Sequence, residues 1–210
     1  MKSTRPCLCT DEDLCSAPQQ ARSLARRQAL LDAARDLFAK QGYEGTSVDQ
    51  IATAAGSASG AFYTYFKSKR QLLLVLMDQL LEQLEALDLT PPGDVGTRVG
   101  LRVFLRDVFR TDVAAYGTIR AWQEAPKADA AFVPHAAAVE AWTVARIERV
   151  FRQLQRFRNG RADAEVRPFA RMMDRHFWSL LATAGTIPPR ELDREIRVAA
   201  DVIHRYLFAT

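Results

Sequence analysis

The chain has 210 residues, of which 48% are hydrophobic and 26% charged, and its formal net charge is +4. This is the composition of an ordinary soluble protein, long enough for one large domain or two small ones. The longest apolar run, Leu72–Met77, is far shorter than the roughly 18 residues of a membrane-spanning helix, and the N-terminus lacks the apolar stretch of a secretory signal. We therefore expect a cytoplasmic protein.

The positive charge is concentrated in one segment. Residues 16–70 carry eight Lys and Arg side chains against four acidic ones, whereas residues 71–210 carry nineteen against eighteen. An excess of cations on a single module is typical of a surface that faces phosphates. The distribution of charge therefore indicates that residues 16–70 bind nucleic acid.

Residues 1–20 contain Pro6, Pro18 and mixed polar residues without periodicity, which predicts a disordered N-terminal tail. All three cysteines of the chain, Cys7, Cys9 and Cys15, lie within it. An odd number of cysteines in a polar segment is not a disulfide framework. We interpret them as incidental thiols of the tail, with a soft-metal site or an oxidant sensor as the alternative.

Helical periodicity begins at Arg22 and continues almost to the end of the chain. The first helix carries an apolar stripe and ends at Gly42, in the position that a C-terminal glycine usually takes. The stripe consists of Leu30, Ala34, Leu37 and Phe38.

A short second helix is predicted with Thr46 as its N-cap, Asp49 in its first turn and Gly56 at its end. Its inner face is formed by Val48, Ile51, Ala52 and Ala55.

A third helix is expected over Ser57–Tyr65, with Phe62 and Phe66 directed into the core. Ser68 then caps a longer helix with leucines at helical spacing.

Pro91, Pro92 and Gly93 break the chain, and further helices are expected after them. Two of these carry unbroken apolar stripes and are separated by Pro188 and Pro189. No convincing alternating strand occurs, so the sequence predicts an all-α protein. The expected helices lie near residues 97–115, 118–125, 131–158, 164–184 and 190–208.

Residues 46–66 have the layout of a helix-turn-helix. The two short helices meet at Ala55-Gly56, where glycine adopts a left-handed backbone at little cost, and the small side chain of Ala52 lets the helices cross closely. In this motif the second helix enters the major groove of DNA. Its predicted exposed surface is small and rich in hydroxyl groups, which lets a helix approach base edges and thymine methyl groups. These exposed residues are Ser57, Ala58, Ser59, Gly60, Ala61, Tyr63 and Thr64.

A longer stretch is similar to the N-terminal domain of the TetR family of bacterial transcription regulators. Residues 45–66 read GTSVDQIATAAGSASGAFYTYF and are followed by KSKRQL at 67–72. The preceding residues, Ala29–Phe38 and then Gly42-Tyr43, match the first helix of the family, so the resemblance covers about residues 22–80. It implies a homodimer that binds double-stranded DNA at a pseudo-palindromic operator.

The resemblance also implies roles for particular residues. Thr46, Tyr63 and Lys69 match positions that contact phosphates in the family, and Tyr65 matches one that is partly core. Ser59 departs from the pattern, because relatives often have Lys or Arg there, so a bidentate guanine contact from this helix is not expected. The full predicted DNA-binding set is Thr46, Ser47, Ser57, Ser59, Gly60, Ala61, Tyr63, Thr64, Tyr65, Lys67 and Lys69.

The resemblance further implies a division into residues 1–20 as tail, 21–70 as DNA-binding domain and 71–210 as helical ligand-binding and dimerisation domain. The last two helices, near 164–184 and 190–208, would pair with their copies. We expect a repressor that an unidentified small molecule releases from DNA, with activation left open, and no cofactor or metal.

Aromatic side chains with a few polar ones suit a pocket for a planar or hydrophobic compound. Each of them alone is better explained as core or surface than as a ligand contact. The candidate ligand-binding residues are Phe104, Tyr116, Trp122, Glu124, His135, Trp142, His176, Phe177 and Trp178.

Two other functional classes are less consistent with the sequence. An enzyme is disfavoured, because there is no Gly-rich phosphate loop, no His-Glu-x-x-His motif and no Gly-x-Ser-x-Gly elbow, and the three histidines are widely spaced. A helical adaptor that binds only a protein partner fits the all-α pattern but leaves residues 46–70 unexplained. Sequence-specific DNA binding distinguishes the regulator from the adaptor.

Overall fold

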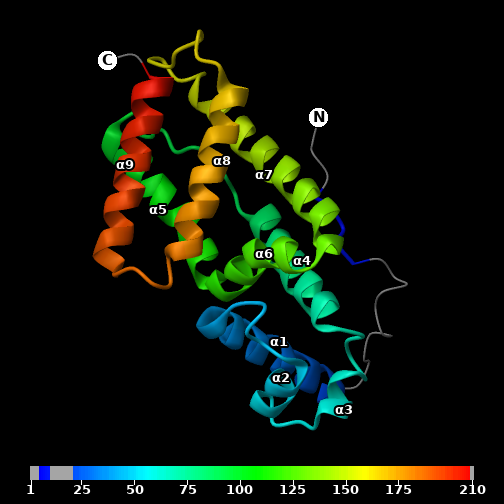
Figure 1. The fold of residues 1–210 in the computed structure, drawn as a ribbon. Coiled ribbons are helices and arrows are strands. Elements are labelled where there is room, and N and C mark those ends of the chain that lie inside the picture. The colour runs from blue at the N-terminus through cyan, green and yellow to red at the C-terminus, as the bar shows by residue number, and fades with distance from the viewer. Residues whose placement is uncertain (1–4, 10–20, 209–210) are drawn as a thin grey trace. The chain divides into compact units, whose positions relative to one another are not determined.

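The computed structural model describes residues 5–9 and 21–208, apart from the side chains of 110–112. This part of the chain is helical and contains no strand, only an isolated bridge between Gly160 and Phe208 (Figure 1). The prediction of an all-α fold is confirmed. The helices are α1 (Ala21–Gln41), α2 (Val48–Ala54), α3 (Ser59–Phe62), α4 (Lys69–Ala86), α5 (Arg98–Ala114), α6 (Tyr116–Ala128), α7 (Val133–Leu154), α8 (Val166–Thr183) and α9 (Pro189–Leu207), with a 3₁₀ turn at Ala130–Phe132.

Two helices are shorter than the sequence predicts. α3 ends at Phe62, because the next amides bond three residues back: the Tyr65 amide donates to the Phe62 carbonyl at 2.9 Å. α7 begins only at Val133, since the Asp129 carboxylate accepts the Ala131 amide and holds the preceding residues in a 3₁₀ turn. None of the described helices is long and apolar enough to cross a membrane.

The helices form two compact units that are discontinuous in sequence. The first, which we call the N-terminal unit, contains the described residues of 5–85 together with 115–136. The second, the C-terminal unit, contains 86–114 and the described residues from 137 onward. The unit that holds α2 and α3 therefore includes α6, although α6 lies far beyond residue 70. The functional division at residue 70 stays a prediction.

In the N-terminal unit, α1 packs closely against α6. Leu30, Ala34 and Phe38 are buried as their spacing predicts, together with Leu31, while Leu37 is only half-buried. Gly117 makes the close approach possible, because a Cβ atom there would collide with the carbonyl oxygen of Arg35. The backbones of the two helices are thus in direct contact.

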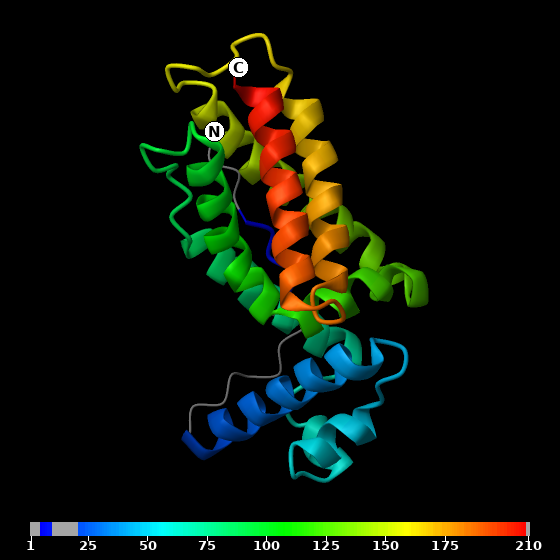
Figure 2. The ribbon, with the colours of Figure 1, turned by 90° about the vertical axis from the view of Figure 1, so that its left-hand side faces the viewer.

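In the C-terminal unit, α8 and α9 run side by side (Figure 2). The predicted stripes of both helices supply the core, with Met173 and Ile203 at most 2% exposed. Phe169 contacts both Phe151 and Tyr206, at ring-centroid distances of 5.3 and 4.0 Å. The stripes are therefore largely internal to one chain.

The prediction of a disordered tail is wrong for residues 5–9. These residues pack on α4, and Leu8 is only 2% exposed. The cause is Asp78, whose carboxylate accepts hydrogen bonds from the backbone amides of Leu8 and Cys9. The rest of the predicted tail, including Cys15, lies outside the described residues.

Candidate nucleic-acid interface

The turn between α2 and α3 has the expected left-handed glycine. Gly56 has φ +66°, and the Ser57 amide donates to the Ala52 carbonyl at 2.9 Å, which closes the end of α2. Ile51, Ala52 and Phe62 are fully buried between the two helices. The helix-turn-helix of residues 46–66 is thus a packed unit, with α3 held against α2 at its inner face.

Ser47, not Thr46, is the N-cap of α2. The Ser47 hydroxyl accepts the Gln50 amide at 3.2 Å, while the Gln50 side chain accepts the Ser47 amide at 2.8 Å. This reciprocal capping box satisfies two amides that a helix start leaves without partners. The prediction of a Thr46 cap is wrong, and the spacing Ser-x-x-Gln in the sequence was the signal for the correct one. Asp49 lies in the first turn, as predicted.

Thr46 instead makes a buried hydrogen bond within the loop between α1 and α2. It is 1% exposed, and its hydroxyl donates to the Gly42 carbonyl at 2.7 Å. Gly42 has φ +74° and ends α1 with its amide bonded to the Phe38 carbonyl. Because the Thr46 hydroxyl is buried and engaged, the exposed hydroxyl at the start of α2 is that of Ser47.

Lys69 also has internal partners. Its ammonium donates to the carbonyls of Tyr43 and Thr46, each at 2.7 Å, and lies 4.2 Å from the centre of the Tyr43 ring. Burial lowers the pKa of Lys69, and the charge of Glu44 opposes that shift. In this arrangement the lysine fastens the loop between α1 and α2 to the start of α4.

The outer face of the motif is small and polar, as the sequence predicts. Tyr63 is 57% exposed, whereas Tyr65 is buried and its hydroxyl accepts a hydrogen bond from Ser23 at 3.1 Å. The exposed predicted residues are Ser47, Gly60, Tyr63, Thr64 and Lys67, and the half-buried ones are Ser57, Ser59, Ala61 and Lys69.

The first turns of α1 carry three arginines. Arg22 and Arg26, at the start of α1, are exposed. Arg27 is turned inward instead, with its guanidinium 5.3 Å from the centre of the Phe66 ring. Burial lowers the pKa of Arg27.

The end of α1 is held by an ion pair on α6 that the sequence did not reveal. Arg120 donates to the Ala39 carbonyl at 2.8 Å, and Glu124 accepts both the Tyr43 amide at 2.7 Å and the Arg120 guanidinium at 3.1 Å. Gly42 leaves room for this carboxylate, since a Cβ atom there would collide with it. Glu124, a candidate ligand-binding residue, therefore uses its carboxylate to stabilise the end of α1.

The other candidate ligand residues are divided between the two units. In the N-terminal unit, the buried Trp122 packs edge-on against Phe132 at 5.9 Å. In the C-terminal unit, Phe177 packs edge-on against Phe109 at 5.0 Å. Tyr116, Trp122, Glu124 and His135 belong to the first unit, and Phe104, Trp142, His176, Phe177 and Trp178 to the second.

Asp174 is a buried acid of the C-terminal unit that the sequence analysis missed. It is 2% exposed on α8, and its Oδ2 atom accepts no hydrogen bond. Burial raises the pKa of Asp174 to about 6, and the nearby Glu140 carboxylate adds to the rise. Hydrogen bonds from Thr143 and Trp178 act in the opposite direction. Its spacing from Ala170 and Leu181, which places it on the buried face of α8, was the signal that could have identified it.

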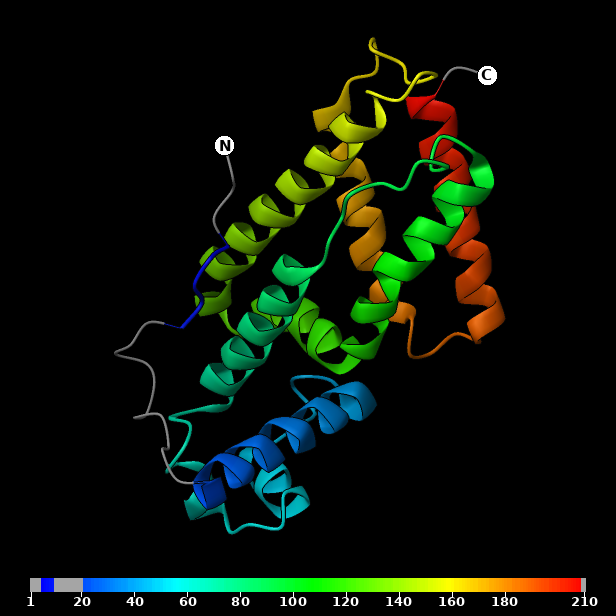
Figure 3. The same ribbon diagram turned by 180° about the vertical axis from the view of Figure 1, so that it is seen from behind.

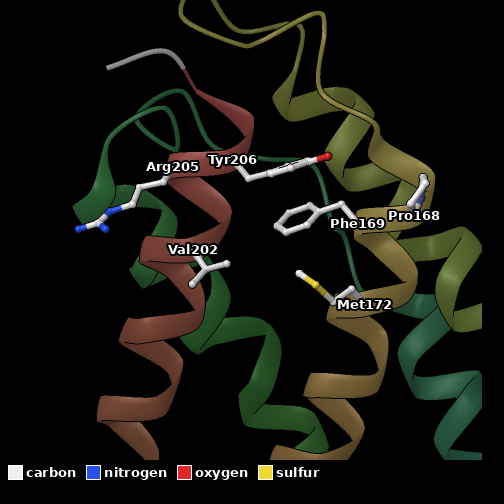
Figure 4. Close-up of a pocket in the computed structure, with 6 residues that line it drawn as sticks. All are labelled: Pro168, Phe169, Met172, Val202, Arg205 and Tyr206. Carbon is white, nitrogen blue, oxygen red and sulfur yellow. The ribbon is translucent and has the colours of Figure 1, made fainter.

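A shallow apolar hollow of about 490 Å³ lies on the outer side of α8 and α9 (Figure 4). Met172 on α8 and Val202 on α9 are 52% and 41% exposed there. Exposed apolar side chains gathered on a rigid pair of helices are typical of an interaction surface. The hollow is lined by Pro168, Phe169, Met172, Val202, Arg205 and Tyr206.

The packed α2–α3 pair and the second helical unit define a helix-turn-helix protein with a helical C-terminal unit. Residues 30–76 match the family model described as bacterial regulatory proteins, tetR family. Over these residues the chain is similar to the DNA-binding N-terminal domain of that family.

Curated relatives match a part of the chain. The chain is 40% identical over 68 residues to the Transposon Tn10 TetC protein of Escherichia coli, covering 32% of this chain and 34% of that protein. It is 35% identical over 83 residues to the HTH-type transcriptional repressor KstR of Rhodococcus jostii (strain RHA1), covering 40% and 37%. The chain thus matches about a third of the length of these relatives.

Solved structures share the fold over most of the chain. A SmeT–triclosan complex has a TM-score of 0.66 at 24% identity, covering 88% of this chain and 92% of that one. The regulatory protein TetR from Rhodobacter sphaeroides has a TM-score of 0.67 at 21% identity, covering 87% and 98%. At these identities the likeness extends to the fold alone, which includes the helical C-terminal unit.

Proposed function

We propose that this chain is a transcription regulator of the TetR type, which binds operator DNA through α2 and α3 as a homodimer and is released by a small molecule. The observation that carries the proposal is the outer face of α3. It is short, exposed and formed by small or hydroxyl-bearing side chains, on a motif whose inner face is fully packed. Such a helix can lie deep in the major groove.

The start of α2 is the proposed phosphate site. Its N-terminus carries the partial positive charge of the helix, and Ser47 exposes a hydroxyl beside it. Tyr63 and Lys67, both exposed, would reach the DNA backbone on either side of α3. With no long donor at Ser59, base readout would depend on Thr64, on hydroxyl groups and on contacts with thymine methyl groups.

A second copy of the chain is the proposed partner of α8 and α9. The exposed Met172, Val198 and Val202 give this pair of helices an apolar outer side. A two-fold dimer presents the same surface from both subunits, and its two recognition helices then require half-sites about one helical turn of DNA apart. This argument predicts a pseudo-palindromic operator.

The C-terminal unit is the proposed site of a small-molecule signal. One protein of the same fold is described in complex with triclosan, a small aromatic compound. In our proposal a ligand that contacts residues such as Phe177 and Trp178 favours a conformation whose recognition helices no longer fit the operator. It can do so only through a difference in its affinity for the two conformations.

The proposal is tested by selecting bound duplexes from a random DNA library with the purified full-length protein at near-physiological salt. We expect a pseudo-palindrome, and Tyr63→Ala should bind it more weakly than the wild type. A folded dimer that enriches no sequence would contradict the proposal and favour a helical adaptor for a protein partner.

A further inference from the structure

Residues 5–9 form a strap across α4, drawn in blue in Figure 3. Asp78 holds it at three points: its carboxylate accepts the Leu8 amide at 3.1 Å, the Cys9 amide at 3.2 Å and the Arg5 guanidinium at 3.1 Å. Arg5 also lies 3.5 Å from the Glu85 carboxylate. The Asp78 carboxylate thus binds both the backbone amides of the strap and its charged guanidinium group.

The strap carries two thiols in different surroundings. Cys7 is exposed, and its Sγ donates to the Cys9 carbonyl at 3.0 Å. Cys9 is 7% exposed and lies close enough to the Arg27 guanidinium for the charge of its thiolate to raise the pKa of that arginine. A neighbouring guanidinium stabilises a thiolate, which is the nucleophilic form of cysteine. The exposed thiol can meet a dissolved oxidant, and the buried one interacts with the charge of Arg27.

Arg27 connects the charge of this thiol with the core of the helix-turn-helix. Its guanidinium lies 5.3 Å from the centre of the Phe66 ring. Phe66 is fully buried and packs against Phe62 of α3 at 5.6 Å. Arg27 therefore interacts both with the charge of Cys9 and with an aromatic ring of the core.

We propose that Cys7 and Cys9 form a peroxide-sensitive modification site, at which a disulfide detaches the strap from α4 and weakens DNA binding. The strap chemistry stands on its own contacts, whereas its effect on DNA rests on the proposed function.

The reaction balances with a peroxide as the oxidant. The Cys7 thiol attacks the peroxide, which gives a sulfenic acid at Cys7 and releases water from hydrogen peroxide. The Cys9 thiol then attacks the sulfenic sulfur, so that a sulfur–sulfur bond forms, and the hydroxyl group leaves with the proton of the Cys9 thiol as a second water. Two thiols are oxidised by two electrons in total, and one peroxide is reduced by two.

The disulfide is incompatible with the docked strap. Its formation requires the two Cβ atoms to approach to about 4 Å, with Cys7 exposed and Cys9 buried beside Arg27. Because Cys7 is exposed and Cys9 is buried, at least one of the two side chains must leave its position, and the backbone that Asp78 holds must move with it. The two amide hydrogen bonds to Asp78 are lost as a result.

The chemical step is tested in full-length protein carrying Cys15→Ser, which removes the third thiol. After treatment with hydrogen peroxide at low protein concentration, we expect both remaining thiols to resist alkylation and the mass to fall by two hydrogen atoms. Dithiothreitol should reverse both changes. The matched control is Cys7→Ser in the same background, which should form no internal disulfide. Thiols that stay alkylatable would overturn the proposal.

Strap release and its consequence are measured separately. Hydrogen exchange at the Leu8 and Cys9 amides should accelerate at least about tenfold in the oxidised protein, and Asp78→Asn should accelerate it without oxidant. Affinity for the selected operator should fall about tenfold on oxidation, and the Cys7→Ser control should be unaffected. A disulfide that leaves both exchange and affinity unchanged overturns the proposal. Faster exchange in a protein that binds no DNA in either state sinks the proposed function and leaves the modification site standing.

Discussion

Lys69 lies over the ring of Tyr43 and donates to the carbonyl oxygen of the same residue, so that one ammonium binds both the side chain and the backbone of its partner. The carbonyl of Thr46 completes its contacts. Since charged hydrogen bonds to buried carbonyls are stronger than neutral ones, this lysine is a structural element of the loop between α1 and α2. The resemblance to TetR-type proteins implies instead that Lys69 contacts a phosphate of DNA. The structural role and the phosphate contact predict different effects of replacing this lysine.

Replacing Lys69 by Met keeps most of the packing and removes the ammonium. We expect the free energy of unfolding to fall by about 1–3 kcal/mol, because two buried carbonyls lose their charged donor. Urea denaturation measures the change. Lys67→Met is the matched control, since Lys67 is exposed and should change stability by less than about 0.5 kcal/mol. If the Lys69 variant and the wild type have equal free energies of unfolding, the lysine does not stabilise the loop, and the phosphate contact remains as its role.

The correction of the α2 cap gives a second prediction. Ser47→Ala removes the capping hydroxyl and should lower the free energy of unfolding by about 1 kcal/mol. It should also weaken binding to all DNA sequences, because the same hydroxyl is the proposed phosphate contact. Thr46→Val should destabilise the fold by a similar amount, about 1 kcal/mol, but leave the salt dependence of DNA binding unchanged. A steeper loss of DNA affinity for Thr46→Val than for Ser47→Ala would restore the original assignment.

A third prediction concerns Glu124. Glu124→Ala leaves the Tyr43 amide and the Arg120 guanidinium without their acceptor, and we expect a loss of about 1–3 kcal/mol in the free energy of unfolding. Glu124→Gln retains an acceptor and should recover part of it. Circular dichroism during thermal unfolding compares the two variants. If both are as stable as the wild type, the carboxylate is available to a ligand after all.

Asp174 leads to a pH dependence. Its pKa in the folded protein is raised to about 6, above the ordinary value of 3.8, so the folded state holds the proton more tightly than the unfolded one. Its contribution to stability is therefore fully present below the ordinary value and is lost as the pH rises through about 6. Asp174→Asn cannot lose a proton there, and should gain on the order of 2 kcal/mol relative to the wild type between pH 4 and pH 7.5.

This pH dependence is measured as the difference in unfolding free energy between Asp174→Asn and the wild type. The contributions of the other titrating groups cancel in that difference. Glu140→Gln is a useful companion, because removing this neighbouring charge should lower the Asp174 pKa and shift the transition to lower pH. A difference that stays constant from pH 4 to pH 7.5 would mean that Asp174 remains charged throughout.

Much of the fold follows from local patterns in the sequence. Gly42 and Gly56 are predicted turn residues and both have positive φ, because a left-handed end is a local property of a helix. The all-α class and the apolar stripes of α8 and α9 were predictable for the same reason, since periodicity depends on neighbours within a few turns.

Partners that are distant in sequence are what local patterns do not reveal. The sequence offers Glu124 only as a pocket residue, whereas its acceptor role toward Tyr43 depends on a contact across 81 positions. No local pattern near Leu8 indicates its partner Asp78, which lies 70 residues further on. Thr46 is a different case, since the neighbouring Ser-x-x-Gln pattern predicts Ser47 as the cap from local sequence alone.

Gly117 and the ion pair on α6 determine when the N-terminal unit can finish folding during translation. The end of α1 is completed by backbone and side-chain partners on α6, which is translated some 75 residues later. While the ribosome is still producing α5, the nascent recognition motif lacks the surface on which α1 rests. The N-terminal unit therefore reaches its final form only after residue 136 has left the exit tunnel, and a chain that stalls within α5 presents an immature DNA-binding motif to the cell.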